Sequence, residues 1–132
     1  MVVGRLAELW LSDIATELGW NECLAQLHRA TAGLTGRIVV CADYRALILL
    51  NPTVADALLV WLKQVSPRVE RTAVLLPKNA PTLRLQVDRL VREARDPNHR
   101  ICAEAAEVDA WLGPHLNEKE RARLAQFLTS AD

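Results

Sequence analysis

The chain has 132 residues, of which 51% are hydrophobic and 24% are charged, and its sixteen basic residues balance its sixteen acidic ones. This length fits one domain with a substantial core, and the balanced charge provides no overall field that attracts nucleic acid or an anionic membrane. The longest apolar runs fall far short of the ~20 residues of a membrane-spanning helix, and the N-terminus lacks a signal-peptide pattern. We therefore expect a single soluble, cytoplasmic domain over residues 1–132, with no transmembrane segment and no nucleic-acid partner.

Charge is nevertheless uneven along the chain. Residues 68–100 contain eight Lys and Arg against four Asp and Glu, whereas residues 101–132 contain three against six. Spacings such as Arg84, Asp88 and Arg92 are typical of a solvated helix face. We interpret the basic segment as ordinary surface chemistry, with a basic patch beside an acidic tail as the alternative.

The N-terminal segment, residues 3–11, fits two patterns. Leu6, Leu9 and Trp10 recur at helical spacing, but the alternation of Leu9 and Leu11 around Trp10 is typical of an edge strand. We predict a strand that ends near Ser12. A helix capped by Thr16 follows, with Trp20, Leu24 and Leu27 on one face, and glycines at 33 and 36 end it.

The strongest strand pattern is residues 37–45, RIVVCADYR. Five apolar residues from Ile38 to Ala42 offer no polar face, which is typical of a central parallel strand buried on both sides. Asp43, Tyr44 and Arg45 follow them. The ligand crevice of an open α/β sheet lies at this end of the strands, so these three are candidate binding residues.

The rest of the chain alternates helices and strands. Asn51 and Pro52 predict the cap and first turn of a helix over residues 53–65. Its apolar stripe consists of Val54, Leu58, Leu62 and Val65. Off that stripe lie Leu59, Val60 and Trp61, which predict either burial between two layers or a partner. Further segments are a strand at 71–77, a helix from 82 to about 94, a strand at 100–103, a helix at 105–112 closed by Gly113, and a last helix at 117–129.

These elements predict an α/β fold with one sheet layer. We expect about four strands, mostly parallel, with the N-terminal strand antiparallel and helices on both faces. A capping box of Asn117 and Glu120 opens the last helix.

Motif searches find no catalytic or cofactor signature. Cys23, Cys41 and Cys102 and the three histidines are too scattered for a disulfide framework or a metal site, and no glycine-rich phosphate loop or nucleophile elbow occurs. We therefore predict no enzyme activity, no cofactor and no metal. Lys78 follows the 71–77 strand, so it should share the sheet edge with Asp43 and Arg45. We expect Asp43 there either to cap a turn or pair with Arg45, or to contact a ligand or partner.

The central strand, the helix PTVADALLVWL, the strand RTAVLLP, the helix LQVDRLVREA and the closing DAWL resemble the SpoIIAA-like group of the STAS superfamily. The resemblance covers residues 3–112 and is greatest to small stand-alone bacterial members, so that the last helix, 117–129, is an addition. It implies a regulatory domain that binds a kinase or an anti-sigma factor. It also implies a phosphorylated Ser or Thr at the start of the helix after the central strand, where Thr53 stands without the usual preceding Asp.

Two functions follow as expectations. The first is a non-enzymatic signalling or protein-protein interaction module that contacts a partner, or a second copy in a homodimer, through the helix 53–65 and the loop 43–51. Its contact residues include Asn51, Thr53 and Trp61. The second is a small-molecule or lipid carrier that uses the crevice beside Asp43, Tyr44 and Lys78, for which a small apolar ligand is expected.

Overall fold

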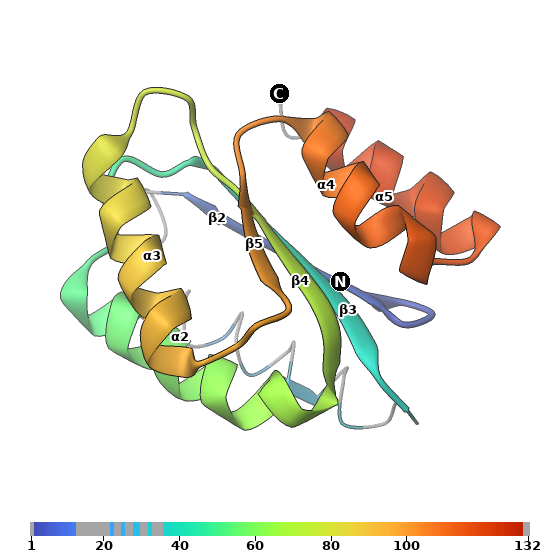
Figure 1. The fold of residues 1–132 in the computed structure, drawn as a ribbon, viewed down its shortest axis with the longest axis horizontal. Coiled ribbons are helices and arrows are strands. Elements are labelled where there is room, and N and C mark those ends of the chain that lie inside the picture. The colour runs from blue at the N-terminus through green and yellow to red at the C-terminus, as the bar shows by residue number, and fades with distance from the viewer. Residues whose placement is uncertain are drawn as a thin grey trace.

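The computed structural model describes residues 2–12, 22, 25, 28, 29, 32 and 36–130. A five-stranded sheet in the order β1-β2-β3-β4-β5 forms its centre (Figure 1). The strands are β1 (Val2–Val3), β2 (Leu6–Ser12), β3 (Ile38–Ala46), β4 (Val69–Leu75) and β5 (His99–Cys102). Strands β2 to β5 are parallel to one another, which confirms the predicted α/β class.

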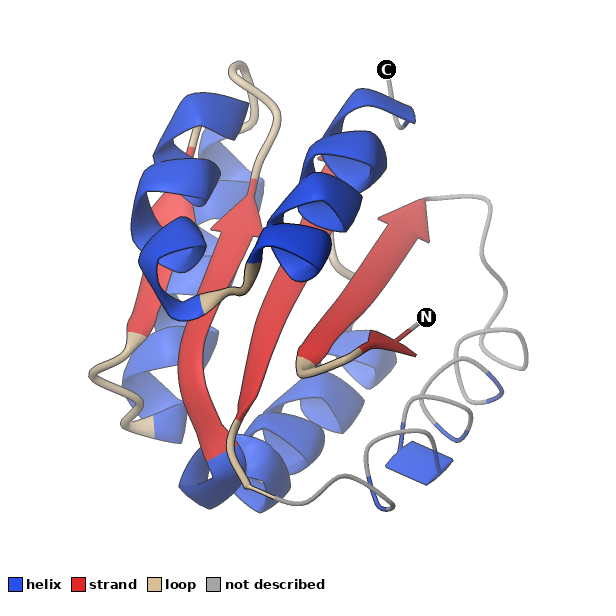
Figure 2. Ribbon diagram, turned by 90° about the vertical axis from the view of Figure 1, so that its right-hand side faces the viewer, coloured by secondary structure: helices blue, strands red, loops and turns tan. Residues whose placement is uncertain are grey.

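Helices cover both faces of the sheet (Figure 2). They are α2 (Pro52–Val65), α3 (Pro81–Ala94), α4 (Ala105–Leu112) and α5 (Glu118–Ser130), with 3₁₀ turns at Ser66–Arg68 and Gly113–His115. Each crossover moves one strand further in the same direction, and right-handed crossovers then place α2 and α3 on one face. Helices α4 and α5 close the other face. Within the described ranges, no helix combines the length and the apolar character needed to cross a bilayer.

The structure corrects the predicted orientation of the N-terminal strand. Residues 6–12 do form a strand, but β2 is parallel to β3, with Leu6 beside Val39 and Leu9 beside Ala42. Only the two residues of β1 run antiparallel to β2. The alternating pattern of side chains is the same for either direction, so it carried no information on orientation. Most of the helix predicted from Thr16 to Gly33 lies outside the described residues; 22, 25, 28, 29 and 32 are helical.

Strand β3 divides the core into two parts by alternation. Val40, Ala42 and Tyr44 face α2 and α3, whereas Val39 and Cys41 face α4 and α5. The strand continues to Ala46, beyond the apolar run, so Asp43, Tyr44 and Arg45 belong to it and do not follow it. Both faces of the sheet are therefore covered in the region of the candidate residues.

The local signals for helix ends agree with the structure. The Asn51 side chain accepts a hydrogen bond from the Thr53 amide at 2.8 Å, with Pro52 in the first turn of α2. Asn117 and Glu120 exchange the two bonds of a capping box, at 2.9 and 2.8 Å. These contacts involve residues two or three positions apart, which is why sequence alone predicts them.

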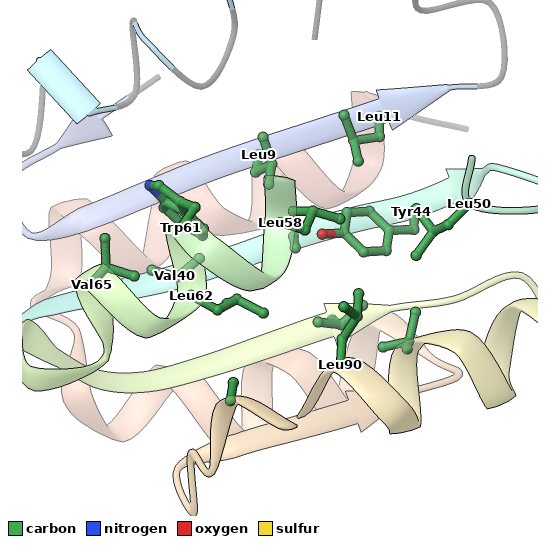
Figure 3. Close-up of a cluster of buried hydrophobic side chains, with 14 of the residues drawn as sticks. Leu9, Leu11, Val40, Tyr44, Leu50, Leu58, Trp61, Leu62, Val65 and Leu90 are labelled. Atoms are coloured by element: carbon green, nitrogen blue, oxygen red, sulfur yellow. The ribbon is translucent and has the colours of Figure 1, made fainter. Parts of the chain in front are cut away.

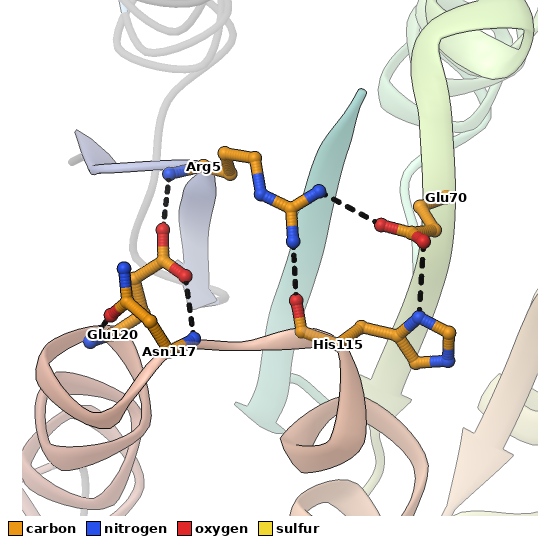
Figure 4. A network of polar contacts seen from close by, with 5 residues as sticks. All are labelled: Arg5, Glu70, His115, Asn117 and Glu120. Atoms are coloured by element: carbon orange, nitrogen blue, oxygen red, sulfur yellow. Dashed lines mark hydrogen bonds and ion pairs between the residues drawn. The ribbon is translucent and has the colours of Figure 1, made fainter. Parts of the chain in front are cut away.

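A polar network seats the junction of α4 and α5 on the sheet (Figure 4). The Arg5 guanidinium donates to Glu70 on β4 at 2.9 Å and to the carbonyl of His115, and His115 Nδ1 lies 3.1 Å from the Glu70 carboxylate. The Glu120 carboxylate also accepts from the Arg5 amide at 2.7 Å. Gly4 precedes Arg5 with φ +56, and a Cβ there would collide with Glu120, so the turn requires glycine.

Candidate functional site

A groove of about 600 Å³ opens at the carboxyl-terminal edge of the sheet, between the loop that follows β3 and the loop that follows β4. Its lining is mostly apolar and consists of Arg45, Ala46, Leu47, Ile48, Leu49, Pro77, Asn79, Ala80, Pro81 and Thr82. The strand order is sequential, so the described strands contain no reversal of order to open a crevice. The two loops therefore build the groove themselves.

The loop after β3 is fixed at both ends and exposed in the middle. Leu47 and Leu50 are buried, and the Gln86 side chain of α3 bonds both the amide and the carbonyl of Leu50 at 3.0 Å. Between these anchors Ile48 is 73% exposed and Leu49 is 50% exposed. An anchored loop that holds two large apolar side chains in water is a preformed apolar surface.

Asp43 is fully buried and engaged inside the protein. Its carboxylate accepts from Nε and from a terminal nitrogen of Arg45, at 3.1 and 2.9 Å, and also from the Arg45 amide. Arg45 in turn donates to the carbonyl of Leu128 on α5 at 2.6 Å. Asp43 therefore neutralises Arg45, and Arg45 ties β3 to α5. The contact is the pair with Arg45 that was expected as the structural alternative to ligand binding.

Asn51 and Thr53 lie at the exposed N-terminus of α2, next to the loop that carries Ile48 and Leu49. The Asn51 side chain is occupied as the cap. Thr53 is exposed, and its position in the first turn of a helix is one where a phosphate is electrostatically favourable.

Tyr44 and Trp61 both lie in the core between the sheet and α2 (Figure 3). Each is 4% exposed, so neither presents its side chain to solvent in this conformation. Trp61 lies three residues after Leu58 and four before Val65, which places it on the buried face of α2. Of the three residues predicted to lie off the stripe, Val60 is 56% exposed, Leu59 is partly buried and Trp61 is buried.

Lys78 is exposed at the same sheet edge and pairs with Glu104, the N-cap of α4, at 2.9 Å. A hydrogen bond and the charge of Glu104 raise the pKa of Lys78 above its usual value. It is absent from the groove lining, and its ion pair connects the loop after β4 to the loop after β5.

The side chains of Cys41, Cys102 and His99 on the sheet are buried. Burial, and then the negative charges of Asp43 and Glu8, raise the pKa of Cys41 far above that of a free thiol. Burial raises the pKa of Cys102 to about 11 and lowers that of His99 to about 4. Thiols with raised pKa values are poor nucleophiles at neutral pH. Among the described residues no three metal-ligating side chains come together.

Two features of this site were not predicted from the sequence. The Gln86 clamp joins residues 36 positions apart, and no local pattern marks it. The exposure of Ile48 and Leu49 has a weak signal: residues 46–50 form an apolar run after a strand, too short for a helix and bounded by Asn51 and Pro52. A loop of that kind is rarely buried along its whole length.

Searches with the chain against family models, characterised proteins and solved structures find no match to any of them. The function must be argued from the site itself.

Proposed function

We propose that the protein is a non-enzymatic interaction module that binds a protein partner through the loop after β3 and the adjoining groove. The observation that carries this proposal is the exposure of Ile48 and Leu49 on a loop anchored at both ends by Leu47, Leu50 and the Gln86 clamp. Pre-organised apolar side chains lose little entropy on binding, which favours their use as interface anchors.

The chemistry of the groove supports binding over catalysis. Arg45 is its one ionisable lining residue, and the charge of Arg45 is compensated by Asp43. The remaining lining residues are apolar except for Asn79 and Thr82. A general acid or base needs a group that can exchange a proton near neutral pH within reach of a substrate, and the paired arginine is the only ionisable side chain in this lining.

The STAS-like resemblance adds a regulatory element to the proposal. We propose Thr53 as the phosphorylated residue, because its hydroxyl is exposed in the first turn of α2 beside the apolar loop. A phosphate there would add negative charge at the rim of the contact surface and so control the partner.

The lipid-carrier alternative receives less support. A lipid needs an enclosed apolar cavity, and the cavity between the sheet and helices α2 and α3 measures about 10 Å³, roughly the space of one water molecule. The groove at the sheet edge has the volume of a small-ligand site but is open to solvent.

The test compares partner binding by the parent and by a variant with Ile48→Ser and Leu49→Ser. Each protein is immobilised and exposed to a lysate of the source organism, retained proteins are quantified, and retained partners are titrated as purified proteins. We expect the double variant to bind its partner at least about tenfold more weakly, because both anchors are lost. Native mass spectrometry of the parent reports a second copy or a retained small molecule.

Leu85→Ser is the matched control, because Leu85 is a 65% exposed apolar residue on α3 outside the groove lining. It should bind like the parent. Equal binding by the parent and the double variant would contradict the proposed surface, and a ligand mass that disappears on denaturation would favour the carrier.

A further inference from the structure

Two arginines converge on one tryptophan on the α4 face of the sheet. The Arg71 guanidinium carbon lies 3.8 Å from the centre of the Trp111 ring, and that of Arg100 lies 5.6 Å from it. Arg71 is on β4 and Arg100 is on the neighbouring strand β5, each two residues before a side chain that packs under α4, Ala73 and Cys102. Both therefore project to the same side of the sheet.

The tryptophan is fixed to β4 by two hydrogen bonds. Its indole N–H donates to the carbonyl of Thr72 at 3.0 Å, and Arg71 donates to the carbonyl of Trp111 at 3.1 Å. The ring and Arg71 thus brace each other. Arg100 is exposed on the edge strand, and its guanidinium makes no hydrogen bond or ion pair with any residue that the structure describes.

The acidic residues of the surrounding elements are already engaged elsewhere. Glu70 of β4 bonds Arg5 and His115, and Glu104 pairs with Lys78. Glu107 accepts from the amides of Ala103 and Glu104, and Asp109 pairs with Arg121. None of these bonds goes to Arg71 or Arg100.

Two uncompensated positive charges thus share one ring. The two distances to the ring place the guanidinium carbons within about 10 Å of each other, roughly the range over which charges interact at 0.1 M salt. Their mutual repulsion is relieved when an anion lies between them. The two arginines also belong to the basic segment 68–100, whose excess positive charge the groove at the other end of the sheet does not use.

We propose that Arg71, Arg100 and Trp111 form a binding site for the oxyanion of a ligand, either a phosphate or a carboxylate group. A guanidinium presents paired N–H donors that match both groups, and Trp111 holds the Arg71 donors in place before binding. The site lies on the α4 face, toward the amino-terminal ends of β4 and β5, and is separate from the groove between the βα loops. It takes an anionic group, whereas the proposed use of the groove is contact with a protein partner.

The experiment is a titration of the ¹⁵N-labelled full chain with inorganic phosphate, and separately with acetate, at constant ionic strength. The signal of the Trp111 indole N–H, assigned from Trp111→Phe, reports binding. We expect a saturable shift with millimolar affinity for at least one anion. Arg100→Gln should weaken binding at least about tenfold, the effect of one lost charge-assisted hydrogen bond.

Arg84→Gln is the matched control, because Arg84 is an exposed arginine on α3 that makes no contact with Trp111. The affinity of Arg84→Gln for the anion should equal that of the parent. That result would show that Arg100→Gln does not act through a general loss of positive charge. Saturation by phosphate alone assigns a phosphate ester, and saturation by acetate alone assigns a carboxylate. The proposal is overturned if neither anion gives a saturable shift, or if Arg100→Gln binds as tightly as the parent.

Discussion

His99 is buried on β5, and neither of its ring nitrogens has a hydrogen-bond partner among the described residues. Burial lowers its pKa to about 4, while Asp96, whose carboxylate lies 3.9 Å from Nδ1, opposes that shift. The cavity beside the ring is lined also by Tyr44, Thr72 and Trp61. The apolar surroundings outweigh the single nearby carboxylate, so the native protein keeps this histidine neutral.

That neutrality makes stability depend on pH. The pKa of His99 is near 6.5 when unfolded and about 4 when folded, so the unfolded chain binds the proton first as pH falls. The contribution of neutral His99 is complete above about pH 6.5 and is lost toward pH 4. We expect the free energy of unfolding to drop by about 2 kcal/mol between pH 7.5 and pH 5 from this residue.

Urea unfolding of the parent and of His99→Leu at the two pH values measures this contribution. Leucine is apolar, fills similar space and does not titrate. The variant should lose less stability than the parent over the same interval, and parallel pH profiles would show that His99 is not the buried neutral group described above.

At the scale of elements, α5 is fixed to the sheet by ion pairs as well as by apolar contacts. Arg123 donates to both oxygens of Glu8 on β2 at 2.9 to 3.2 Å, and the Glu8 side chain is 2% exposed. Arg121, two residues earlier, makes a similar pair with Asp109 on α4, but both of those side chains are about half exposed. Helix α5 thus makes one ion pair with a buried carboxylate, Glu8, and one with a half-exposed carboxylate, Asp109.

The two pairs should differ in energy. Arg123→Met removes the charge-assisted hydrogen bonds that the buried Glu8 carboxylate accepts from Arg123, so it should lower the free energy of unfolding by about 2 kcal/mol or more. Arg121→Met should cost clearly less than Arg123→Met, because solvent screens the exposed pair. Adding Glu8→Met to Arg123→Met should recover most of the loss, since the buried carboxylate is removed together with its arginine.

Urea unfolding at pH 7 of the three variants and of Glu8→Met alone gives the coupling energy of the pair. An equal cost for Arg123→Met and Arg121→Met would contradict the inference that burial decides the strength of these contacts.

The elements that sequence predicted well are those fixed by near neighbours. The caps at Asn51 and Asn117 and the apolar run of β3 depend on residues a few positions apart. The end of β3 is different: it extends past Ala42 because Asp43 is neutralised by Arg45, which is bonded to a carbonyl 83 residues away. The same contact keeps Asp43 out of the groove lining. The sequence therefore predicts the location of the candidate site at this sheet edge, but it does not predict that Ile48 and Leu49 are the exposed side chains there.

On the scale of the whole molecule, the sheet has two cores, and the second depends on the C-terminal helices. Leu124, Phe127 and Leu128 of α5 are buried with Val39 and Cys41 of β3. From the STAS-like resemblance, the sequence predicts the last helix as an addition to the domain. In the structure its apolar face covers the centre of the sheet. Two buried carboxylates also depend on α5. Glu8 pairs with Arg123 of α5, and Arg45, the partner of Asp43, donates to the carbonyl of Leu128 on α5.

Deleting residues 117–132 should therefore unfold the protein. Burial of three large side chains contributes roughly 1.5–3 kcal/mol each, which together is comparable with a total stability of roughly 5–15 kcal/mol. Alkylation of Cys41 and Cys102 followed by peptide mass spectrometry reads the result, because both thiols are buried in the full chain. They should react within minutes in the deletion variant and remain protected in the parent.

Phe127→Ala, which keeps the helix, should be folded but less stable by about 3 kcal/mol. If the shortened chain kept both cysteines protected and its near-ultraviolet circular dichroism, α5 would be an appendage, and the sheet with α2, α3 and α4 would be sufficient to fold.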